Sequence, residues 1–199
     1  MDWYKSITSY RTIPLGLIVI LVLGIALGLR LYGIGWDGGY GFHPDERSIY
    51  MQSDCMYQVL NNDPNHYHCI REHPATEPGI PGITTILDAE KSPLNPHWFP
   101  LGSILIYALV ALRFLIEPFT DLDSLQRMSY LGRSLSALAD VGTVYLVYKI
   151  GRRIFNTQTG ILASILIAFS VIHIQIAHFY RPEPFQTFFL LMAFWYMLR

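Results

Sequence analysis

The feature that most constrains this sequence is a series of long apolar runs. Residues 13–29 contain no charged side chain, and further apolar runs follow at residues 101–116, 130–148, 161–180 and 185–198. Runs of about 20 apolar residues match the thickness of a bilayer core. The chain is 52% hydrophobic and 15% charged, whereas about 25% of residues are charged in an average soluble domain. These values argue against an ordinary soluble fold and a disordered chain, and the net charge of −1 does not indicate nucleic-acid binding.

Charge is distributed unevenly along the chain. Residues 36–128 hold twelve of the fifteen acidic residues, five of the fourteen basic residues and nine of the twelve prolines. This segment therefore carries a net charge of −7, and the rest of the chain carries +6. An acidic, proline-rich stretch between apolar runs with basic flanks is typical of a polytopic membrane protein with one large aqueous loop.

The first apolar run predicts a membrane anchor over residues 13–35. Lys5 and Arg11 lie before it, and Arg30 is expected to snorkel to the membrane surface near its end. A cleaved signal peptide is the alternative, but the run is long for one and no clear small-x-small cleavage site follows it. We expect a retained anchor in the plasma membrane with its N-terminus in the cytoplasm.

A basic turn decides which of the later runs cross the membrane. Lys149, Arg152 and Arg153 form the densest basic cluster of the chain, and the positive-inside rule places such a cluster in the cytoplasm. If every apolar run crossed, this cluster would lie outside. We therefore predict that residues 101–117, the weakest run because an arginine interrupts it, form an interfacial or re-entrant helix on the outer side.

The predicted fold is an all-α polytopic membrane protein, a transmembrane helix bundle with a large extracytoplasmic first loop that carries interfacial helices. Its parts are a first crossing at residues 13–35, the outer loop at 36–128, a second crossing at 129–150, a third at 161–180 and an incomplete fourth helix at 185–199. The last run is too short to span a bilayer at about 1.5 Å per residue. We therefore expect the chain to be the N-terminal part of a single, longer transmembrane domain.

Cys55 and Cys69 both lie in the predicted outer loop. An oxidising compartment would permit a disulfide between them, but two free cysteines fit the sequence equally well, because spacing does not fix geometry. His66, His68 and His73 lie nearby and could imitate a zinc site with the cysteines. Their spacing fits no standard structural site, so we interpret them as residues of the loop surface.

Two outer turns carry candidates for chemistry. Pro44 starts a predicted helix with Asp45 and Glu46 in its first turn, where carboxylates suit the helix dipole. Simple helix capping is the alternative, and the local pattern alone favours it. Residues 181–184 form a second outer turn, Arg-Pro-Glu-Pro. Acidic groups on two outer turns beside an arginine indicate a site for a lipid phosphate; the alternative is a solvated turn in which the arginine pairs with its neighbouring glutamate.

We expect the polar residues inside the predicted crossings to stabilise the packing of helices rather than to act in catalysis. Asp140 is expected to pair with an arginine or with a polar group of another helix rather than to act in catalysis. His173, Gln175 and His178 are expected to form hydrogen bonds between helices rather than to bind a metal.

Four segments occur in an informative order. They are the anchor followed by His43-Pro44-Asp45-Glu46, the stretch Asn95 to Leu101, the helix from Gly132-Arg133-Ser134-Leu135 to Tyr148–Phe155, and Ile174 to Phe189 around Arg181-Pro182-Glu183. In this order and spacing they resemble the N-terminal portion of GT-C class membrane glycosyltransferases, in the protein mannosyltransferase and aminoarabinose transferase-like family (glycosyltransferase family 39-like). The resemblance covers nearly the whole chain except about residues 52–92.

The resemblance implies a glycosyltransferase that moves a sugar from a polyprenyl- or dolichyl-phosphate donor to an acceptor on the extracytoplasmic side. It assigns Asp45 as the general base, with Glu46 as its acidic neighbour in the catalytic pair. The residues expected to bind substrate are Arg181, Glu183, His43 and His97. In this family the second outer turn usually reads Arg-Pro-Asp. Glu183 keeps the negative charge of that aspartate, but its longer side chain changes where the carboxylate can reach.

The predicted chemistry requires no cofactor, although a divalent cation would suit the carboxylates. No residue is assigned as a metal ligand, because Trp98 and Phe99 stand where some relatives carry an acidic or lysine residue. The expected partners are membrane lipids, the polyprenyl-phosphate sugar donor and an unknown acceptor, either a protein or a lipid-linked glycan.

Two other functions fit parts of the sequence. A transporter or lipid-carrier flippase would line its pathway with Asp140, but it would also predict paired hydrophobic repeats that the sequence lacks. An inactive, truncated or assembly member of the transferase fold is the other alternative.

Overall fold

The computed structural model describes residues 14–63, 69, 73–77, 79, 82, 84–120, 122 and 124–199. Within these residues all regular structure is helical, in agreement with the predicted class. The α-helices are α1 (Leu15–Leu31), α2 (Pro44–Leu60), α3 (Ile104–Ile116), α4 (Leu125–Ile154), α5 (Thr157–Ala168), α6 (Val171–Ala177) and α7 (Pro182–Met197), and a short 3-10 helix, η1, covers Pro74–Thr76.

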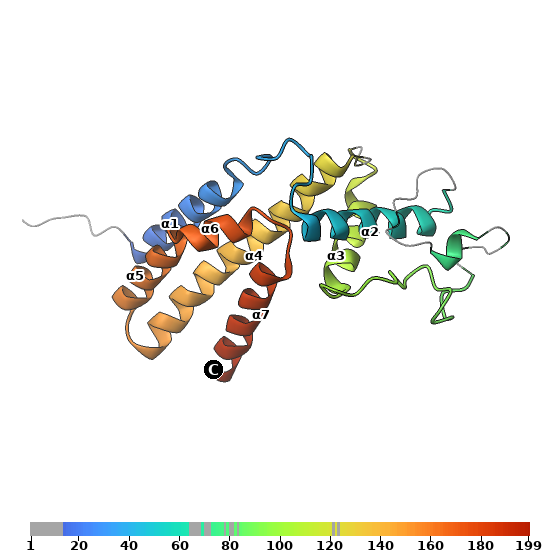
Figure 1. Cartoon of the computed structure of the whole chain (residues 1–199). Coiled ribbons are helices and arrows are strands. Elements are labelled where there is room, and N and C mark those ends of the chain that lie inside the picture. The colour runs from blue at the N-terminus through green and yellow to red at the C-terminus, as the bar shows by residue number, and fades with distance from the viewer. Residues whose placement is uncertain are drawn as a thin grey trace, which may run out of the picture.

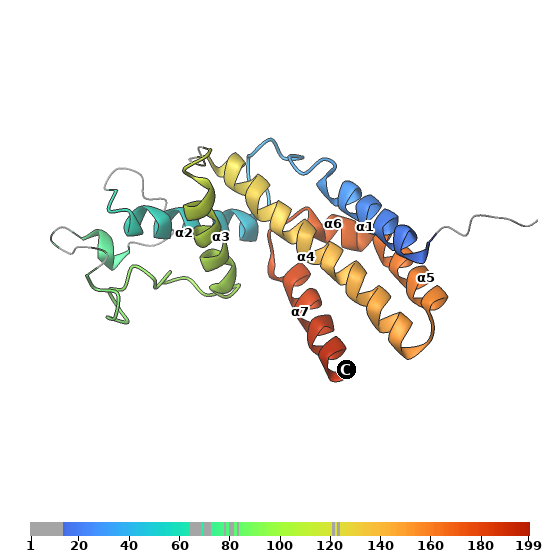
Figure 2. The ribbon, with the colours of Figure 1, turned by 180° about the vertical axis from the view of Figure 1, so that it is seen from behind.

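Helix α4 is the axis of the molecule. Its 30 residues span about 45 Å. Helices α1, α5, α6 and α7 pack along most of its length and form the helix bundle (Figure 1). Helices α2 and α3 pack against each other near the N-terminal end of α4 and form a lobe with the described part of the loop between them. Seen from behind, the lobe and the free end of the bundle lie at opposite ends of α4 (Figure 2).

The centre of the bundle contains a buried ion pair. Arg30 of α1 is fully buried, and its Nε lies 2.5 Å from Oδ2 of Asp140 in α4. The other carboxylate oxygen of Asp140 lies 2.7 Å from Nδ1 of His173 in α6. The structure therefore confirms that Asp140 pairs with an arginine and that His173 bonds between helices. The expectation that Arg30 snorkels outward is wrong, because burying it beside Asp140 compensates the charge of both groups.

The predicted third crossing at residues 161–180 is not one helix. Helix α5 ends at Ala168, and α6 continues from Val171 at an angle of 58°. Arg30 explains how the break is tolerated: its Nη1 donates to the carbonyl of Ala168 at 3.1 Å and its Nη2 to that of Ile167 at 3.4 Å. The carbonyl of Ile167 also accepts the N–H of Ser170 at 3.1 Å, so the bond from Arg30 matters most for the carbonyl of Ala168 at the helix end. Hydropathy could not predict this break, because the residues around it remain apolar.

The length and hydropathy of the described helices identify one candidate for a membrane crossing. Among the helices that the structure describes, none taken singly is both long and apolar enough to cross a bilayer, whereas α5 and α6 together meet that requirement as a bent pair. The predicted second crossing at residues 129–150 lies within the longer α4, and the predicted interfacial segment at 101–117 forms the shorter α3.

The lobe is held by an apolar core and by a second buried arginine. Its core joins α2, α3 and the start of α4 through Ile49, Met56, Ile106, Leu109 and Met128. Beside this core, Arg113 of α3 forms an ion pair with Asp54 of α2 and a 2.8 Å bond to Glu117. The guanidinium carbon of Arg113 also lies 3.9 Å from the centre of the Tyr57 ring, a cation–π contact. The packing of α3 on α2 is therefore both apolar and ionic.

At the free end of the bundle, α4 and α5 approach each other through two glycines. A Cβ atom placed on Gly151 would lie 2.9 Å from the Cα of Gly160. One placed on Gly160 would lie 2.6 Å from the carbonyl oxygen of Tyr148 and 2.7 Å from the amide nitrogen of Arg152. Since these are backbone atoms, no side-chain rotation can relieve the contact.

We therefore expect Gly160→Ala to destabilise the bundle by about 1–3 kcal/mol, the usual cost of overpacking. Gly24→Ala is the matched control, because Gly24 is also helical and a Cβ there meets no atom within 4 Å; it should be neutral or stabilising by up to ~1 kcal/mol through helix propensity. Thermal unfolding in a neutral detergent measures both variants. Equal stability of the two variants would show that the close approach is not required.

Candidate active site

The adjacent carboxylates Asp45 and Glu46 begin α2 but have different surroundings. Neighbouring helical residues differ by about 100° in direction, so this divergence is expected. The side chain of Asp45 is 43% exposed, whereas Glu46 is completely buried. The predicted catalytic pair is thus divided into one carboxylate that faces outward and one that faces the interior.

Glu46 is occupied by protein donors. Its Oε1 accepts hydrogen bonds from Oη of Tyr50 at 2.8 Å, from Nε of Arg133 at 2.8 Å and from the backbone N–H of Tyr180 at 2.9 Å. Its Oε2 accepts a bond from Nη2 of Arg133 at 2.8 Å. These bonds connect α2 to α4 and to the turn before α7. They favour a positioning role for Glu46, since its oxygens face donors of the protein rather than a solvent-filled site.

Arg133 also binds the loop between α1 and α2. Its Nη1 and Nη2 donate to the two carboxylate oxygens of Asp37 at 2.9 and 2.8 Å, and Nη1 donates to the carbonyl of Ile34 at 2.8 Å. With the two bonds to Glu46, all five N–H groups of this guanidinium have partners. The Arg133 guanidinium lowers the pKa of Asp37 below its usual range, and bonds from the backbone of Gly39 and Gly41 add to the effect.

The glycines of this loop explain how it reaches Arg133. Gly38, Gly39 and Gly41 have φ values of 59°, 85° and 61°, in the left-handed region that other residues rarely adopt. Asp37 accepts hydrogen bonds from the N–H groups of Gly39 and Gly41 at 3.2 and 3.1 Å. The chain thereby turns sharply from α1 into α2 and brings Asp45 to a fixed place.

The second predicted turn meets the first at Asp45. Nη2 of Arg181 lies 2.5 Å from Oε1 of Glu183 and 3.8 Å from Oδ2 of Asp45. Nη1 of Arg181 donates to Nε2 of His43 at 3.2 Å. The structure therefore brings together four of the predicted residues in one partly exposed cluster, which we call the turn cluster: His43, Asp45, Arg181 and Glu183. The pairing of Arg181 with Glu183 foreseen in the alternative interpretation is also present.

Three polar atoms of the turn cluster are enclosed without a hydrogen-bond partner. They are Nδ1 of His43, Nε of Arg181 and Oε2 of Glu183. Because Nε2 of His43 accepts a bond from Arg181, its Nδ1 carries the proton in the neutral ring and is a free donor. Buried polar groups normally have partners. Two donors and one acceptor without partners in one cluster are typical of a site that binds a polar ligand.

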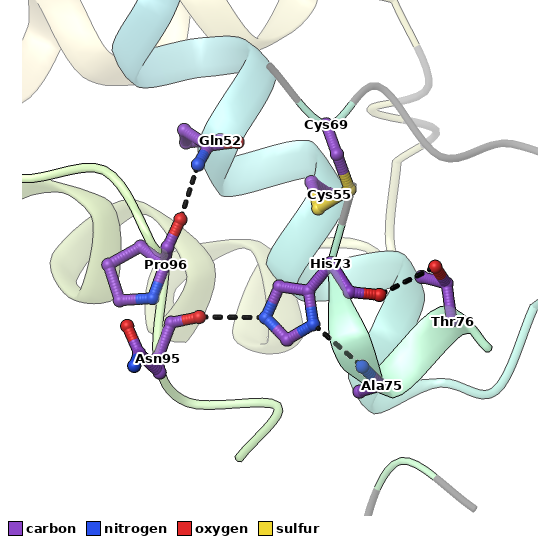
Figure 3. Close-up of a disulfide and its surroundings, with 8 residues drawn as sticks. All are labelled: Gln52, Cys55, Cys69, His73, Ala75, Thr76, Asn95 and Pro96. Atoms are coloured by element: carbon purple, nitrogen blue, oxygen red, sulfur yellow. Dashed lines mark hydrogen bonds between the residues drawn. A yellow bond between two sulfur atoms is a disulfide. The ribbon is translucent and has the colours of Figure 1, made fainter. Parts of the chain in front are cut away.

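His97, the sixth predicted site residue, belongs to the loop of the lobe. Its ring packs edge-on against His73 at a centroid distance of 5.0 Å. The preceding residue, Pro96, accepts a hydrogen bond from the Gln52 side chain (Figure 3), and Gln52 follows Asp45 along α2 by about 10 Å. No interaction within the described residues joins His97 to the turn cluster.

A disulfide joins Cys55 of α2 to Cys69 of the same loop (Figure 3), which decides between the two alternatives left open by the sequence. Close by, His73 is buried, its Nε2 donates to the carbonyl of Asn95 at 2.7 Å, and its Nδ1 accepts the N–H of Ala75 at 3.2 Å. Burial lowers the pKa of His73. His66 and His68 lie outside the described residues, and within those residues no group of three or more metal-binding side chains comes together.

An apolar pocket of about 530 Å³ adjoins the turn cluster. It is lined by Tyr32, Gly33, Trp36, Val171, Ile174, Gln175, His178 and Phe179. Phe179 connects pocket and cluster, because its ring lies 5.0 Å from that of His43 and 5.5 Å from that of Trp36. His178 closes one side by hydrogen bonding to the carbonyl of Tyr32, which confirms its predicted role between helices.

Residues 110–199 match a protein-family model described as dolichyl-phosphate-mannose-protein mannosyltransferase. No curated protein and no solved structure matches the chain. The match confirms the resemblance predicted from the sequence, and at the level of the family it supports glycosyltransferase activity with a lipid-linked donor. Members of this family are integral membrane proteins. The matched segment contains Arg133, Arg181 and Glu183 but not His43 or Asp45.

Sequence analysis did not assign roles to Asp37 and Arg133. Arg133 appeared only as part of a motif, although an arginine at the outer end of an apolar helix is itself a signal of a buried partner or a functional site. Asp37 carries no local signal that distinguishes it from the other carboxylates of the loop. Their pairing depends on the turn that the glycines form.

We expect Arg133→Met to destabilise the protein by about 3–5 kcal/mol, because it leaves the buried carboxylates of Asp37 and Glu46 without their cation. Arg133→Lys should have a smaller effect, since it keeps the charge but not the paired bonds. Arg153→Met, an exposed position on the same helix, is the control and should stay within about 0.5 kcal/mol of the parent. Thermal unfolding in a neutral detergent gives the comparison. A similar loss of stability in Arg133→Met and Arg153→Met would contradict the proposed importance of the ion pairs of Arg133 with Asp37 and Glu46.

Proposed function

We propose that this protein transfers a sugar from a polyprenyl- or dolichyl-phosphate donor to an acceptor hydroxyl on the extracytoplasmic side of the membrane, with Asp45 as general base. The observation that carries the proposal is the approach of Arg181 to Asp45 from a different turn of the chain, at 3.8 Å. A cation suited to a phosphate and a carboxylate suited to a proton thus share one partly exposed site.

Asp45 has the geometry of a proton acceptor. Its carboxylate is exposed, while the bonds to Glu46 fix the first turn of α2 on which it lies. In the proposed reaction the acceptor oxygen forms a bond to the anomeric carbon of the sugar and its proton passes to a carboxylate oxygen of Asp45. The bond between the anomeric carbon and the phosphate oxygen breaks, and both electrons remain on the lipid phosphate.

Arg181 and His43 suit the departing phosphate. The Nε of Arg181 and the Nδ1 of His43 are donors without partners, and hydrogen bonds from charged or polarised donors stabilise the negative charge that develops on the leaving group. Glu183 holds the Arg181 side chain through its Oε1. We therefore assign Glu183 to orienting this guanidinium and Arg181 to binding the phosphate.

The apolar pocket supports a lipid-linked donor. Trp36 and Phe179 form an aromatic wall of this pocket, and the Phe179 ring is in contact with the ring of His43. A donor phosphate at Arg181 would therefore place the first isoprenyl units of its carrier against apolar side chains. Burial of such units in the pocket would contribute about 0.8 kcal/mol for each CH₂ group removed from water.

The proposed topology keeps the turn cluster on the outer side. The first crossing includes α1, the second lies within α4, and the third is the bent pair of α5 and α6; α3 lies at the interface. Both turns of the cluster then emerge at one end of the bundle, and the basic residues Lys149, Arg152 and Arg153 lie at the other end, in the cytoplasm.

The transporter alternative is not favoured by the surroundings of Asp140. A carboxylate that lines a transport pathway needs access to its cargo, but Asp140 is 3% exposed and both of its oxygens have partners in Arg30 and His173. An inactive member of the fold is distinguished from the proposed enzyme only by assay.

The test of the proposed function is transfer of label from polyprenyl-phosphate sugars in membranes that contain the inserted protein. Asp45→Asn should lower the transfer rate by about 10²- to 10⁴-fold, the contribution expected of a general base. Asp88→Asn is the control, because Asp88 is an exposed aspartate of the lobe whose bonds are to its own turn. Insertion and unfolding temperature should be unchanged in both variants. A rate within about threefold of the parent for Asp45→Asn would remove Asp45 from the mechanism.

The role of Arg181 is tested by the dependence of the rate on donor concentration. Arg181→Ala should weaken donor binding by about 1.5–3 kcal/mol, the value of a hydrogen bond to a charged group, with less effect on the acceptor. Arg181→Lys should recover part of the loss, because a point charge does not reproduce two parallel bonds. Glu183→Asp should be tolerated and Glu183→Gln should lower the rate. Unchanged donor dependence in both Arg181→Ala and Glu183→Gln would reduce this turn to a connection between helices.

A further inference from the structure

A second pocket lies at the end of the bundle opposite the turn cluster. It has a volume of about 350 Å³ and is lined by Lys149, Arg152 and Arg153 of α4 and by Trp195 of α7. Side chains connect the two helices here, because Lys149 lies against the ring of Trp195 and Arg153 donates to the carbonyl of Leu198. Three cations and one indole therefore converge on a single concave site.

The three cations of this basic pocket contact neutral groups. Nζ of Lys149 lies 5.0 Å from the ring of Trp195, Nη1 of Arg152 donates to Oη of Tyr148 at 3.2 Å, and Nε of Arg153 donates to the carbonyl of Leu198 at 3.3 Å. None of these contacts neutralises a charge.

Among residues 124–199, no carboxylate side chain is left to neutralise them. Between residues 124 and 199 the acidic residues are Asp140 and Glu183, and these are bound to Arg30 and Arg181 respectively. Within the described residues, no ion pair is formed by Lys149, Arg152 or Arg153. The pocket thus keeps a local charge of about +3.

The helix dipole does not account for this charge. Basic residues are favoured in the last turn of a helix because its C-terminus carries about half a negative charge. That amount compensates a fraction of one cation, whereas three are present. A bound anion would compensate them, and the arginines present the paired N–H groups that bind phosphate well.

The position of the pocket indicates the source of the anion. From Arg133 to Arg152, α4 rises about 28 Å, which is close to the ~30 Å hydrocarbon thickness of a bilayer. If the turn cluster lies at one membrane surface, as proposed above, the basic pocket lies at the other. Trp195 fits this depth, because tryptophan concentrates at the boundary between lipid and water. Phe155 follows the basic residues of α4 and Met197 follows Trp195 in α7, and both are exposed apolar side chains.

We infer that the basic pocket binds the phosphate group of an anionic phospholipid at the membrane surface opposite the turn cluster. The guanidinium groups of Arg152 and Arg153 and the Lys149 ammonium bind the phosphate oxygens, and the acyl chains lie along the apolar surface beside Trp195. The inference depends on the proposed placement of α4 and α7 in the bilayer, but not on the catalytic role of Asp45.

Native mass spectrometry of the whole chain in a neutral detergent tests this inference, with palmitoyl-oleoyl phosphatidylglycerol and the matching phosphatidylcholine as probes. The parent protein should retain phosphatidylglycerol in preference to phosphatidylcholine. Arg152→Gln and Arg153→Gln should each lower the apparent affinity for phosphatidylglycerol about fivefold, as expected for one basic residue near an anionic surface. Lys91→Gln, which removes an exposed cation from the lobe, is the matched control and should bind as the parent does.

Charge-conserving variants separate loss of the site from loss of the fold. Arg152→Lys with Arg153→Lys should keep most of the binding, whereas Arg152→Gln with Arg153→Gln should lose it at an unchanged unfolding temperature. A preference for phosphatidylglycerol that survives the double glutamine variant, or that falls equally in Lys91→Gln, overturns the inference. Millimolar inorganic phosphate that displaces phosphatidylglycerol completely would also overturn it, because the site would then be one for a soluble anion. Because no sugar transfer is measured, failure here is distinguishable from failure of the proposed function.

Discussion

The arrangement of the candidate active site depends on the guanidinium of Arg133. Its five N–H groups hold Asp37 in the first loop, Glu46 in the first turn of α2 and a carbonyl of the same loop. Glu46 in turn accepts the N–H of Tyr180, which begins the turn before α7. Removal of this one side chain would leave two buried carboxylates uncompensated. The two turns that carry the turn cluster are therefore placed relative to each other through one cation on α4.

Two more buried arginines act in the same way at other junctions. Arg30 joins α1 to Asp140 of α4 and satisfies carbonyls at the break between α5 and α6, while Arg113 joins α3 to α2. An ion pair of this kind adds little net stability, because desolvation offsets most of the attraction. What it contributes is a requirement for one geometry, since guanidinium bonds demand fixed directions. We infer that these ion pairs help to select one arrangement of the helices, beside specific contacts such as the approach of Gly151 to Gly160.

Some of this structure follows from local sequence rules and some does not. The division of Asp45 and Glu46 between outside and inside follows from helical geometry, and the start of α2 at a proline follows from its fixed φ. The break within residues 161–180 could not be predicted, because the carbonyls it exposes are satisfied by Arg30, which is remote in the sequence. The partners of Arg133 are likewise set by packing. No partner was predicted for Arg133, because the choice among the many carboxylates of the loop depends on the three-dimensional structure.

The different surroundings of Asp45 and Glu46 have a consequence for the proposed catalytic cycle. Glu46 shares with Asp37 the ion pairs to Arg133 that hold the fold in this region, whereas Asp45 has one ion pair, the 3.8 Å approach of Arg181. A general base gains and loses a proton in every cycle, and a side chain that also held the architecture would strain it each time. If Asp45 is the general base, as proposed, Glu46 supports the fold while Asp45 exchanges protons, so the surrounding scaffold does not have to change during a catalytic cycle.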